Sequence, residues 1–209
     1  MRSYAIGDIH GHLGLLRAAH ELIAADRAAC GDAAAPVVHV GDLVDRGPDS
    51  RGVIAFLMAG QVGGAPWVVL RGNHDRMFSI FLENPWARDP RLRAEFSWFH
   101  PRLGGPQTLL SYGICEPANR PVDQVHAETL AAVPPEQVAW LAGLPGYARV
   151  GDAVFVHAGI RPGIPLAQQT EDDLLWIRSE MGWLPPSPDG IAMCQDGGVE
   201  SHEAERTAK

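Results

Sequence analysis

The chain has 209 residues, of which 46% are hydrophobic and 20% charged, and its formal net charge is −8. This composition is typical of a globular protein with one large α/β domain, and the acidic balance argues against non-specific binding to nucleic acids or anionic membranes, which requires clustered Lys and Arg. No stretch approaches the roughly 18 apolar residues of a membrane span, and three scattered cysteines indicate neither a disulfide framework nor a thiolate metal site, so we expect a cytoplasmic protein.

The N-terminal half alternates short apolar runs with amphipathic segments. We predict strands at residues 3–7, 36–40 and 67–70. Each precedes a predicted helix: one over residues 12–30, one from Asp49 or Ser50 to Gly60, and one that begins near His74 or Asp75. Such alternation is typical of a parallel sheet with helical crossovers.

The C-terminal half gives fewer signals. Residues 85–102 are polar and aromatic and predict a helical insertion over one face, while residues 136–141 predict a short helix. A fourth buried strand is predicted at residues 154–156, followed by His157, and the acidic residues after Thr170 predict another helix start. We therefore expect one domain over residues 1–180 and a divergent, poorly ordered tail over residues 181–209.

Polar residues follow each of the first three predicted strands. Asp8, Asp42 and Asn73 are 34 and 31 residues apart, one in each strand–helix unit. Open α/β sheets build their sites just past the carboxyl ends of their strands, so these three side chains are expected to meet there.

The first two of these segments offer candidate metal ligands. Asp8 and His10 occupy alternate positions, so in an extended segment both side chains face the same way. A carboxylate with an imidazole suits Mn²⁺, Fe, Zn²⁺ or Co²⁺ rather than Ca²⁺, although an isolated Asp-x-His is more often a capped turn. Asp42 is placed so that its two oxygens can bridge two cations. Asp45 and Arg46, which follow it, can also be read as a solvated ion pair in a loop.

The third segment adds a candidate for proton transfer. Asn73 offers a neutral carbonyl oxygen, while the adjacent His74 must point elsewhere and is available as a general acid. Asp45 is the candidate partner that orients it. Other histidines have simpler interpretations: His39 as a hydrogen-bonded core residue, His12 as a helix-opening residue that can touch substrate, and His20, His100 and His126 as surface or loop residues.

Four segments taken together resemble the calcineurin-like metallophosphoesterases: Gly7-Asp8-Ile9-His10-Gly11, Gly41-Asp42-Leu43-Val44-Asp45-Arg46-Gly47, Gly72-Asn73-His74-Asp75 and Val156-His157-Ala158-Gly159. Residues 104–113 and 173–178 are also similar to the bacterial and phage branch of the PPP-type serine/threonine protein phosphatases. The resemblance covers about residues 3–180, and it implies a four-layer α/β/β/α sandwich.

The resemblance also implies a binuclear centre with two divalent metal ions. Mn²⁺ is the expected metal, and Fe, Zn²⁺ and Co²⁺ are the alternatives. One ion would be held by Asp8, His10 and Asp42, and the other by Asp42, Asn73 and His157. Phosphate would be bound by Arg46, Arg178 and Asn73, with His74, oriented by Asp45, as the general acid. A hydroxide bridging the metals would attack phosphorus directly.

The chain departs from the family pattern after Glu180. Relatives place a further metal-binding His in a Gly-His-Thr turn there, followed by more strands of the second sheet. In this chain the only later imidazole is His202, in a charged context unlike a strand-end ligand. We therefore expect the last strands of the second sheet to be missing and the second metal site to be weaker. Truncation, a frame shift and true divergence remain open explanations.

The implied activity is that of a serine/threonine protein phosphatase acting on a phosphoprotein or small phosphoester, without nucleic acid or membrane partners and with an open oligomeric state. Hydrolysis of dinucleoside polyphosphates is an alternative, since such relatives share Gly-Asn-His-Asp, although we expect them to differ at Asp45. The other alternative is a non-catalytic remnant that binds metal without turnover.

Overall fold

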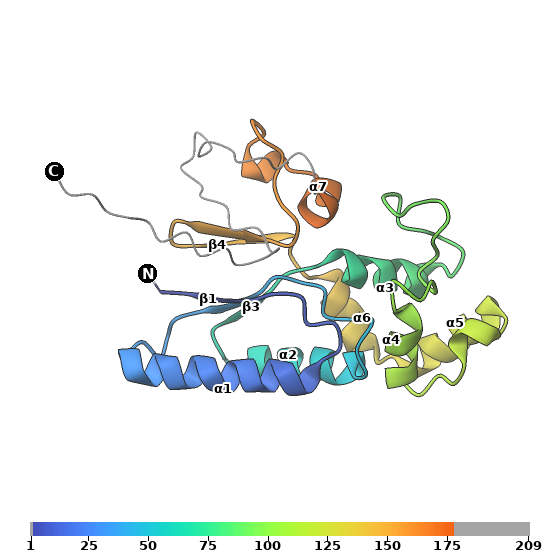
Figure 1. The fold of residues 1–209 in the computed structure, drawn as a ribbon, viewed down its shortest axis with the longest axis horizontal. Helices are drawn as coiled ribbons and strands as arrows, with labels where there is room; N and C mark the ends of the chain where they lie inside the picture. The colour runs from blue at the N-terminus through green and yellow to red at the C-terminus, as the bar shows by residue number, and fades with distance from the viewer. Residues whose placement is uncertain (1, 178–209) are drawn as a thin grey trace.

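In the computed structural model, residues 2–177 are described, and they form two sheets with helices around them (Figure 1). The first half contains β1 (Tyr4–Ile6), α1 (Leu13–Cys30), β2 (Val37–His39), α2 (Ser50–Val62), β3 (Trp67–Val69) and α3 (Asn73–Glu83). The second half contains α4 (Gly105–Ser111), η1 (Pro117–Asn119), α5 (Val122–Ala132), α6 (Pro135–Ala142), β4 (Tyr147–Val150), β5 (Ala153–Val156), η2 (Leu166–Gln168) and α7 (Glu171–Trp176).

The first sheet has the order β1-β2-β3, with all strands parallel. Its central strand β2 is fully buried, and successive side chains of each strand point to opposite faces of the sheet. Val69 joins the large core formed with the helices, whereas Val38 packs with Ala148 and Phe155 of the second sheet. The predicted strands and the parallel crossover topology are confirmed.

The second sheet pairs β4 and β5 antiparallel, and it covers the face of the first sheet opposite α1 and α2 (Figure 1). In the same view α7 lies beyond this second sheet. The described elements therefore follow the predicted α/β/β/α order. The predicted loss of further strands concerns residues outside the described part of the chain.

Local signals fix several helix ends. Helix α1 stops where Gly31 adopts the left-handed conformation and returns its N–H to the carbonyls of Arg27 and Ala28. Helix α2 begins where the Asp49 carboxylate accepts the Gly52 N–H at 2.8 Å, but it continues to Val62 rather than ending at Gly60. The predicted α7 start is confirmed, with Thr170 accepting the Asp173 N–H.

The prediction of a helical insertion at residues 85–102 is wrong. This segment contains turns and bends but no helix. Proline at positions 85, 90 and 101 interrupts helical hydrogen bonding. The segment is held instead by two side-chain contacts with other parts of the fold, Asp89 with Arg76 of α3 and Trp98 with Asp45. Helices α4 and α5 and strand β4 were not predicted. Strand β5 contains the predicted fourth strand, although its side chains are exposed or half-buried.

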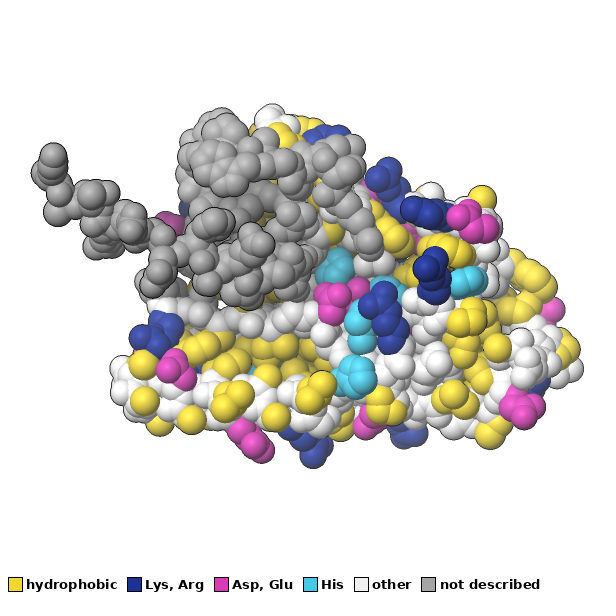
Figure 2. Space-filling view, in the orientation of Figure 1, with side chains coloured by type: hydrophobic (Ala, Val, Ile, Leu, Met, Phe, Trp, Pro, Cys, Tyr) yellow, Lys and Arg dark blue, Asp and Glu magenta, His cyan; other side chains and the backbone are white. Residues whose placement is uncertain are grey.

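No helix within residues 2–177 is long and apolar enough to cross a membrane. On one face of the molecule, imidazoles and carboxylates gather at a single place with a cationic side chain beside them (Figure 2).

Candidate metal centre

The loops after β1 and β2 are joined by their backbones. The N–H groups of Ile9 and His10 both donate to the carbonyl of Asp42, at 3.0 and 2.8 Å, and Gly11 N–H donates to Leu43 at 2.8 Å. These bonds bring two of the predicted ligand segments together before any side chain is considered.

A buried carboxylate joins the second loop to the third. Asp75 accepts the Leu43 N–H at 2.9 Å and the Gly72 N–H at 2.8 Å, one on each oxygen. Burial, followed by the nearby charge of Asp42, raises the pKa of Asp75 to about 7. Asp75 therefore connects the loop after β2 to the loop after β3 through hydrogen bonds, a role that the sequence pattern did not reveal.

Two glycines permit this close approach. A Cβ on Gly72 would lie 2.1 Å from the Asp42 nitrogen and 2.2 Å from its Oδ1, so no side chain fits there. Gly11 has φ +67°, and a Cβ on it would stand 3.0 Å from the backbone of Gly47. The chain therefore turns sharply at Gly11, where a side chain would be strained.

Backbone strain is concentrated at this centre. Five non-glycine residues among residues 2–177 have positive φ, and four of them belong to the candidate site: His10, Asp42, Asp45 and Arg46. Each such conformation costs on the order of 1–3 kcal/mol and persists only where the surroundings enforce it, which is characteristic of functional sites.

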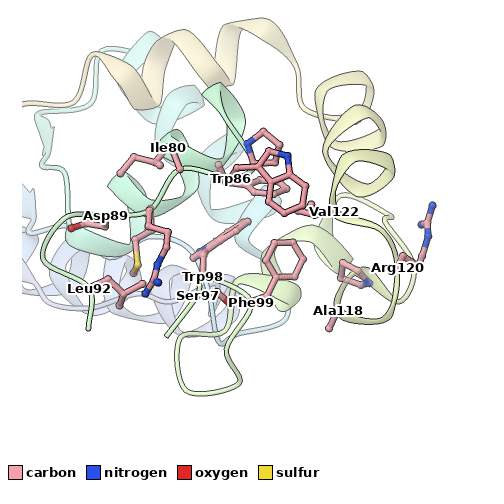
Figure 3. A pocket seen from close by; sticks show the side chains of 16 residues that line it. Ile80, Trp86, Asp89, Leu92, Ser97, Trp98, Phe99, Ala118, Arg120 and Val122 are labelled. Carbon is pink, nitrogen blue, oxygen red and sulfur yellow. The ribbon is translucent and has the colours of Figure 1, made fainter. Parts of the chain in front are cut away.

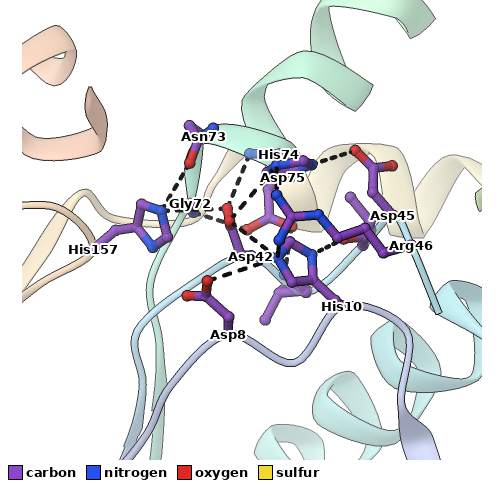
Figure 4. Close-up of polar contacts among 12 residues, drawn as sticks. Asp8, His10, Asp42, Asp45, Arg46, Gly72, Asn73, His74, Asp75 and His157 are labelled. Atoms are coloured by element: carbon purple, nitrogen blue, oxygen red, sulfur yellow. Dashed lines mark hydrogen bonds and ion pairs between the residues drawn. The ribbon is translucent and has the colours of Figure 1, made fainter. Parts of the chain in front are cut away.

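Two histidines present the same ring nitrogen to Asp42 (Figure 4). His10 Nδ1 donates to the Val44 carbonyl at 2.8 Å, and His157 Nδ1 donates to the Val40 carbonyl at 2.9 Å. This leaves Nε2 of each ring as a lone-pair donor directed inward. Metal-binding histidines are commonly oriented by such a hydrogen bond from the other nitrogen.

Asp42 lies between these histidines with one oxygen toward each. Its Oδ1 is 3.4 Å from His157 Nε2, and its Oδ2 is 3.6 Å from His10 Nε2. Asn73 Oδ1 lies 2.9 Å from His157 Nε2 on the same side. The exposed Asp8 places Oδ2 3.7 Å from His10 Nε2. The structure therefore brings all five predicted metal ligands together: Asp8, His10, Asp42, Asn73 and His157.

The donor set suits divalent metal ions. Two groups have ligand atoms within 4.8 Å of one another, Asp8–Asp42–His157 and His10–Asp42–His74, and Asp42 belongs to both. Carboxylate, amide and imidazole donors favour Mn²⁺, Fe, Zn²⁺ or Co²⁺. The grouping differs from the predicted one, which paired Asp8 with His10 and kept His74 apart from the metals.

The charges of this group influence one another. The hydrogen-bonding imidazole of His10 lowers the pKa of Asp8 from its ordinary value. Burial works against a charged imidazole at His10, but the neighbouring carboxylates of Asp8 and Asp42 outweigh it and raise the pKa of His10.

His74 is oriented differently from the other histidines of the centre. Its Nδ1 donates to Asp45 Oδ2 at 2.7 Å, and both side chains are buried. A carboxylate rather than a backbone carbonyl therefore holds this ring, as predicted for Asp45. The exposed Arg46 donates to Nε2 of both His10 and His74, at 2.6 and 3.0 Å.

The other residues named from the sequence lie outside the cluster of candidate metal ligands or outside the described part of the chain. Arg178 and His202 lie outside the described residues, as does the proposed tail. His39 is fully buried and hydrogen-bonded to the Val68 carbonyl, as predicted. His20 and His126 are half-buried rather than superficial: His20 packs on Trp67, and His126 bonds the Leu82 carbonyl.

The sequence reasoning missed Trp98, Thr108 and Ser50, whose polar groups surround Asp45. Thr108 stood within a segment that resembled the phosphatase branch, and no local feature marked it as a contact of Asp45.

The chain matches the profile of the calcineurin-like phosphoesterase family over residues 1–205. It is similar to the crystal structure of a candidate diadenosine tetraphosphatase, with 24% identity and a TM-score of 0.48, covering 81% of this chain and 55% of that one. It is also similar to a metallophosphoesterase from Sphaerobacter thermophilus, with 20% identity and a TM-score of 0.37, covering 76% and 47%. No curated protein matches.

The chain thus spans about half the length of these two solved structures. The family match, in contrast, extends over all of the strand-end loops that carry Asp8, Asp42, Asn73 and His157. Because this match covers nearly the whole chain, the protein belongs to the calcineurin-like phosphoesterase family, whose members use divalent metal ions.

Proposed function

We propose that the protein is a metal-dependent phosphomonoesterase of the serine/threonine protein phosphatase type, with a phosphoprotein as substrate and Mn²⁺ as the metal. The observation that carries this proposal is the His74–Asp45 pair, in which His74 Nε2 lies 4.0 Å from Asp42 Oδ2 and 3.0 Å from the guanidinium of Arg46. A general acid, a cation and a bridging carboxylate are what hydrolysis of a phosphomonoester requires in one place.

The side chains divide the work of this reaction. Two divalent ions, when bound, supply an activated water and neutralise phosphate charge. Arg46 offers two guanidinium N–H groups in a plane, which suits two phosphate oxygens, and Asn73 offers its amide beside them. His74, when protonated on both ring nitrogens, donates its Nε2 proton to the leaving alkoxide, and Asp45 stabilises this charged imidazole through Nδ1–H.

His74→Asn tests the assignment of the general acid. We expect the variant to retain its bound metal while turnover falls by ~10²–10⁴, most severely for substrates with poor leaving groups. Metal content by elemental analysis and rates with a series of aryl phosphates measure both quantities. A parallel loss of metal and rate would make His74 a ligand, as the grouping with His10 and Asp42 allows.

A cavity of about 340 Å³ supports a second candidate, hydrolysis of dinucleoside polyphosphates (Figure 3). It lies between α3, the 85–99 segment and the start of α5, and its lining includes Trp86, Trp98 and Phe99. Aromatic rings stack on nucleobases, and Trp98 also contacts Asp45. A base stacked in this cavity would therefore be linked to the proposed general acid, His74, through two side chains, Trp98 and Asp45.

Substrate preference separates the candidates. We expect Mn²⁺-dependent turnover of a phosphoserine peptide and of aryl phosphates to exceed that of a dinucleoside tetraphosphate, with Phe99→Ala leaving the aryl phosphate rate unchanged. Preferred hydrolysis of the dinucleotide, lost in Phe99→Ala, would favour the second candidate. Metal binding without turnover of any substrate would identify a non-catalytic remnant.

A further inference from the structure

The carboxylate of Asp45 accepts hydrogen bonds from two side chains besides His74, and neither belongs to the predicted site. Its Oδ2 accepts the Trp98 Nε1–H at 2.8 Å in addition to the His74 Nδ1–H at 2.7 Å. Its Oδ1 accepts the Thr108 hydroxyl at 2.7 Å. Asp45 and Thr108 are fully buried and Trp98 is 7% exposed, so water does not compete freely for these bonds.

The hydrogen-bonding capacity of Thr108 is fully used around Asp45. Because its single hydroxyl proton goes to Asp45 Oδ1, its oxygen accepts the Asp45 N–H at 2.8 Å and must also accept from the Ser50 hydroxyl at 3.1 Å. Thr108 therefore fixes both the backbone and the carboxylate of Asp45, whose φ of 72° needs enforcement.

Trp98 is fixed by packing on its other side. Its ring stacks on Phe78 with centroids 5.5 Å apart and contacts Phe81 at 4.9 Å, within the main core. This packing holds the ring with its N–H directed at Oδ2 of Asp45. The same oxygen receives His74, so the position of this oxygen sets the plane and tautomer of the imidazole.

We propose that Trp98 and Thr108 are positioning residues of the reaction, which hold Asp45 in the one orientation that directs His74 Nε2 toward the leaving group. This inference rests on the proposed role of His74. Trp98 belongs to the 85–102 segment and Thr108 to helix α4. The inference therefore gives two elements outside the strand-end loops a role in proton transfer.

The test compares variants that remove one hydrogen bond each. Trp98→Phe keeps the ring without the N–H, and Thr108→Val keeps the shape without the hydroxyl. We expect turnover of phenyl phosphate to fall about tenfold in each, the equivalent of one hydrogen bond to a charged group, and turnover of p-nitrophenyl phosphate to fall far less. We expect Thr108→Ser to keep the wild-type rate, because it keeps the hydroxyl that donates to Asp45.

Matched controls come from the same chain. Trp140→Phe removes an indole N–H that donates to Gln61, and Thr129→Val removes a buried hydroxyl that donates to the Val125 carbonyl. Both bonds lie away from Asp45, so neither variant should change the leaving-group dependence. Thermal unfolding of all variants verifies that they are folded.

Two further measurements decide the outcome. In a His74→Asn background, Trp98→Phe should cause no additional loss, since its effect acts through His74. In the metal-free protein, the low-field NMR resonance of the His74 Nδ1–H should shift in Trp98→Phe but not in Trp140→Phe. An unmoved resonance, or equal slowing of both substrates, overturns the inference. If His74→Asn itself shows no leaving-group dependence, the proposed function fails instead.

Discussion

Asp42 is the residue on which the proposed centre depends most, because among residues 2–177 it belongs to both groups of candidate ligands. Asp42→Asn should therefore weaken both metal sites, whereas Asn73→Ala should weaken one. We expect the activity of Asp42→Asn at saturating Mn²⁺ to be a further ~10–100-fold below that of Asn73→Ala, on the scale by which single groups alter metal affinity. Steady-state rates measure this, and equal residual rates would remove the bridging role.

The candidate site was predictable where it depends on strand ends. Asp8, Asp42 and Asn73 each follow a short apolar strand, and parallel strands bring their carboxyl ends to one edge. The partners of Asp45 were not predictable, because Trp98 and Thr108 lie 53 and 63 positions away and are placed by packing. Local sequence carries no record of such contacts.

At the scale of elements, the first three strands and helices were predictable because their ends carry their own signals, such as Gly31 and Asp49. The 85–102 segment was not, since it is held by partners in other elements. Arg76 of α3 grips Asp89 with two nitrogens at 2.7 and 2.9 Å and reaches Asp172 of α7 at 2.7 Å. These ion pairs, rather than helical hydrogen bonds, hold the 85–102 segment in place.

Replacing Arg76 measures how much these ion pairs contribute to the free energy of unfolding. Arg76→Met leaves the buried Asp89 without its counter-charge, so we expect a loss of about 3–5 kcal/mol in the free energy of unfolding. Arg2→Met is the matched control, because the Arg2–Asp26 pair is solvent-exposed and its loss should change the free energy of unfolding far less. Denaturant unfolding measures both, and similar losses would mean that the Arg76 network contributes little.

His39, the last residue of β2, predicts a pH dependence of stability. Burial lowers the pKa of His39 to about 4, so the folded protein keeps it neutral while the unfolded chain protonates near pH 6.5. Its contribution to stability is therefore complete above pH 6.5 and is lost as the pH falls toward 4.

The comparison with His39→Gln isolates this effect, since the raised pKa of the buried Asp75 acts with the opposite sign over part of the same range. We expect the stability of the wild type relative to the variant to decrease by on the order of 3 kcal/mol between pH 7 and pH 4. Parallel unfolding curves at every pH would show that His39 does not titrate differently in the two states.

At the scale of the whole molecule, the candidate centre joins the two sheets. Asp8, His10, Asp42 and Asn73 follow strands of the first sheet, whereas His157 follows β5 of the second. A cation held by ligands from both sheets would connect layers that otherwise meet through a small apolar cluster around Val38, Val40 and Leu70. Metal binding should therefore raise the unfolding temperature as well as enable catalysis.

The two cations should bind with unequal affinity, because Asp8 brings a second carboxylate to one site while Asn73 brings a neutral amide to the other. Isothermal titration of the metal-free protein with Mn²⁺ should resolve one tight and one weaker binding event, and activity should rise only with the second.

His157→Ala should abolish the weaker binding event and its share of the thermal stabilisation, leaving the tight one intact. Two equal sites in the wild type would contradict the assignment. Loss of the tight event in His157→Ala would instead pair His157 with Asp8, as their closeness to the same Asp42 carboxylate permits.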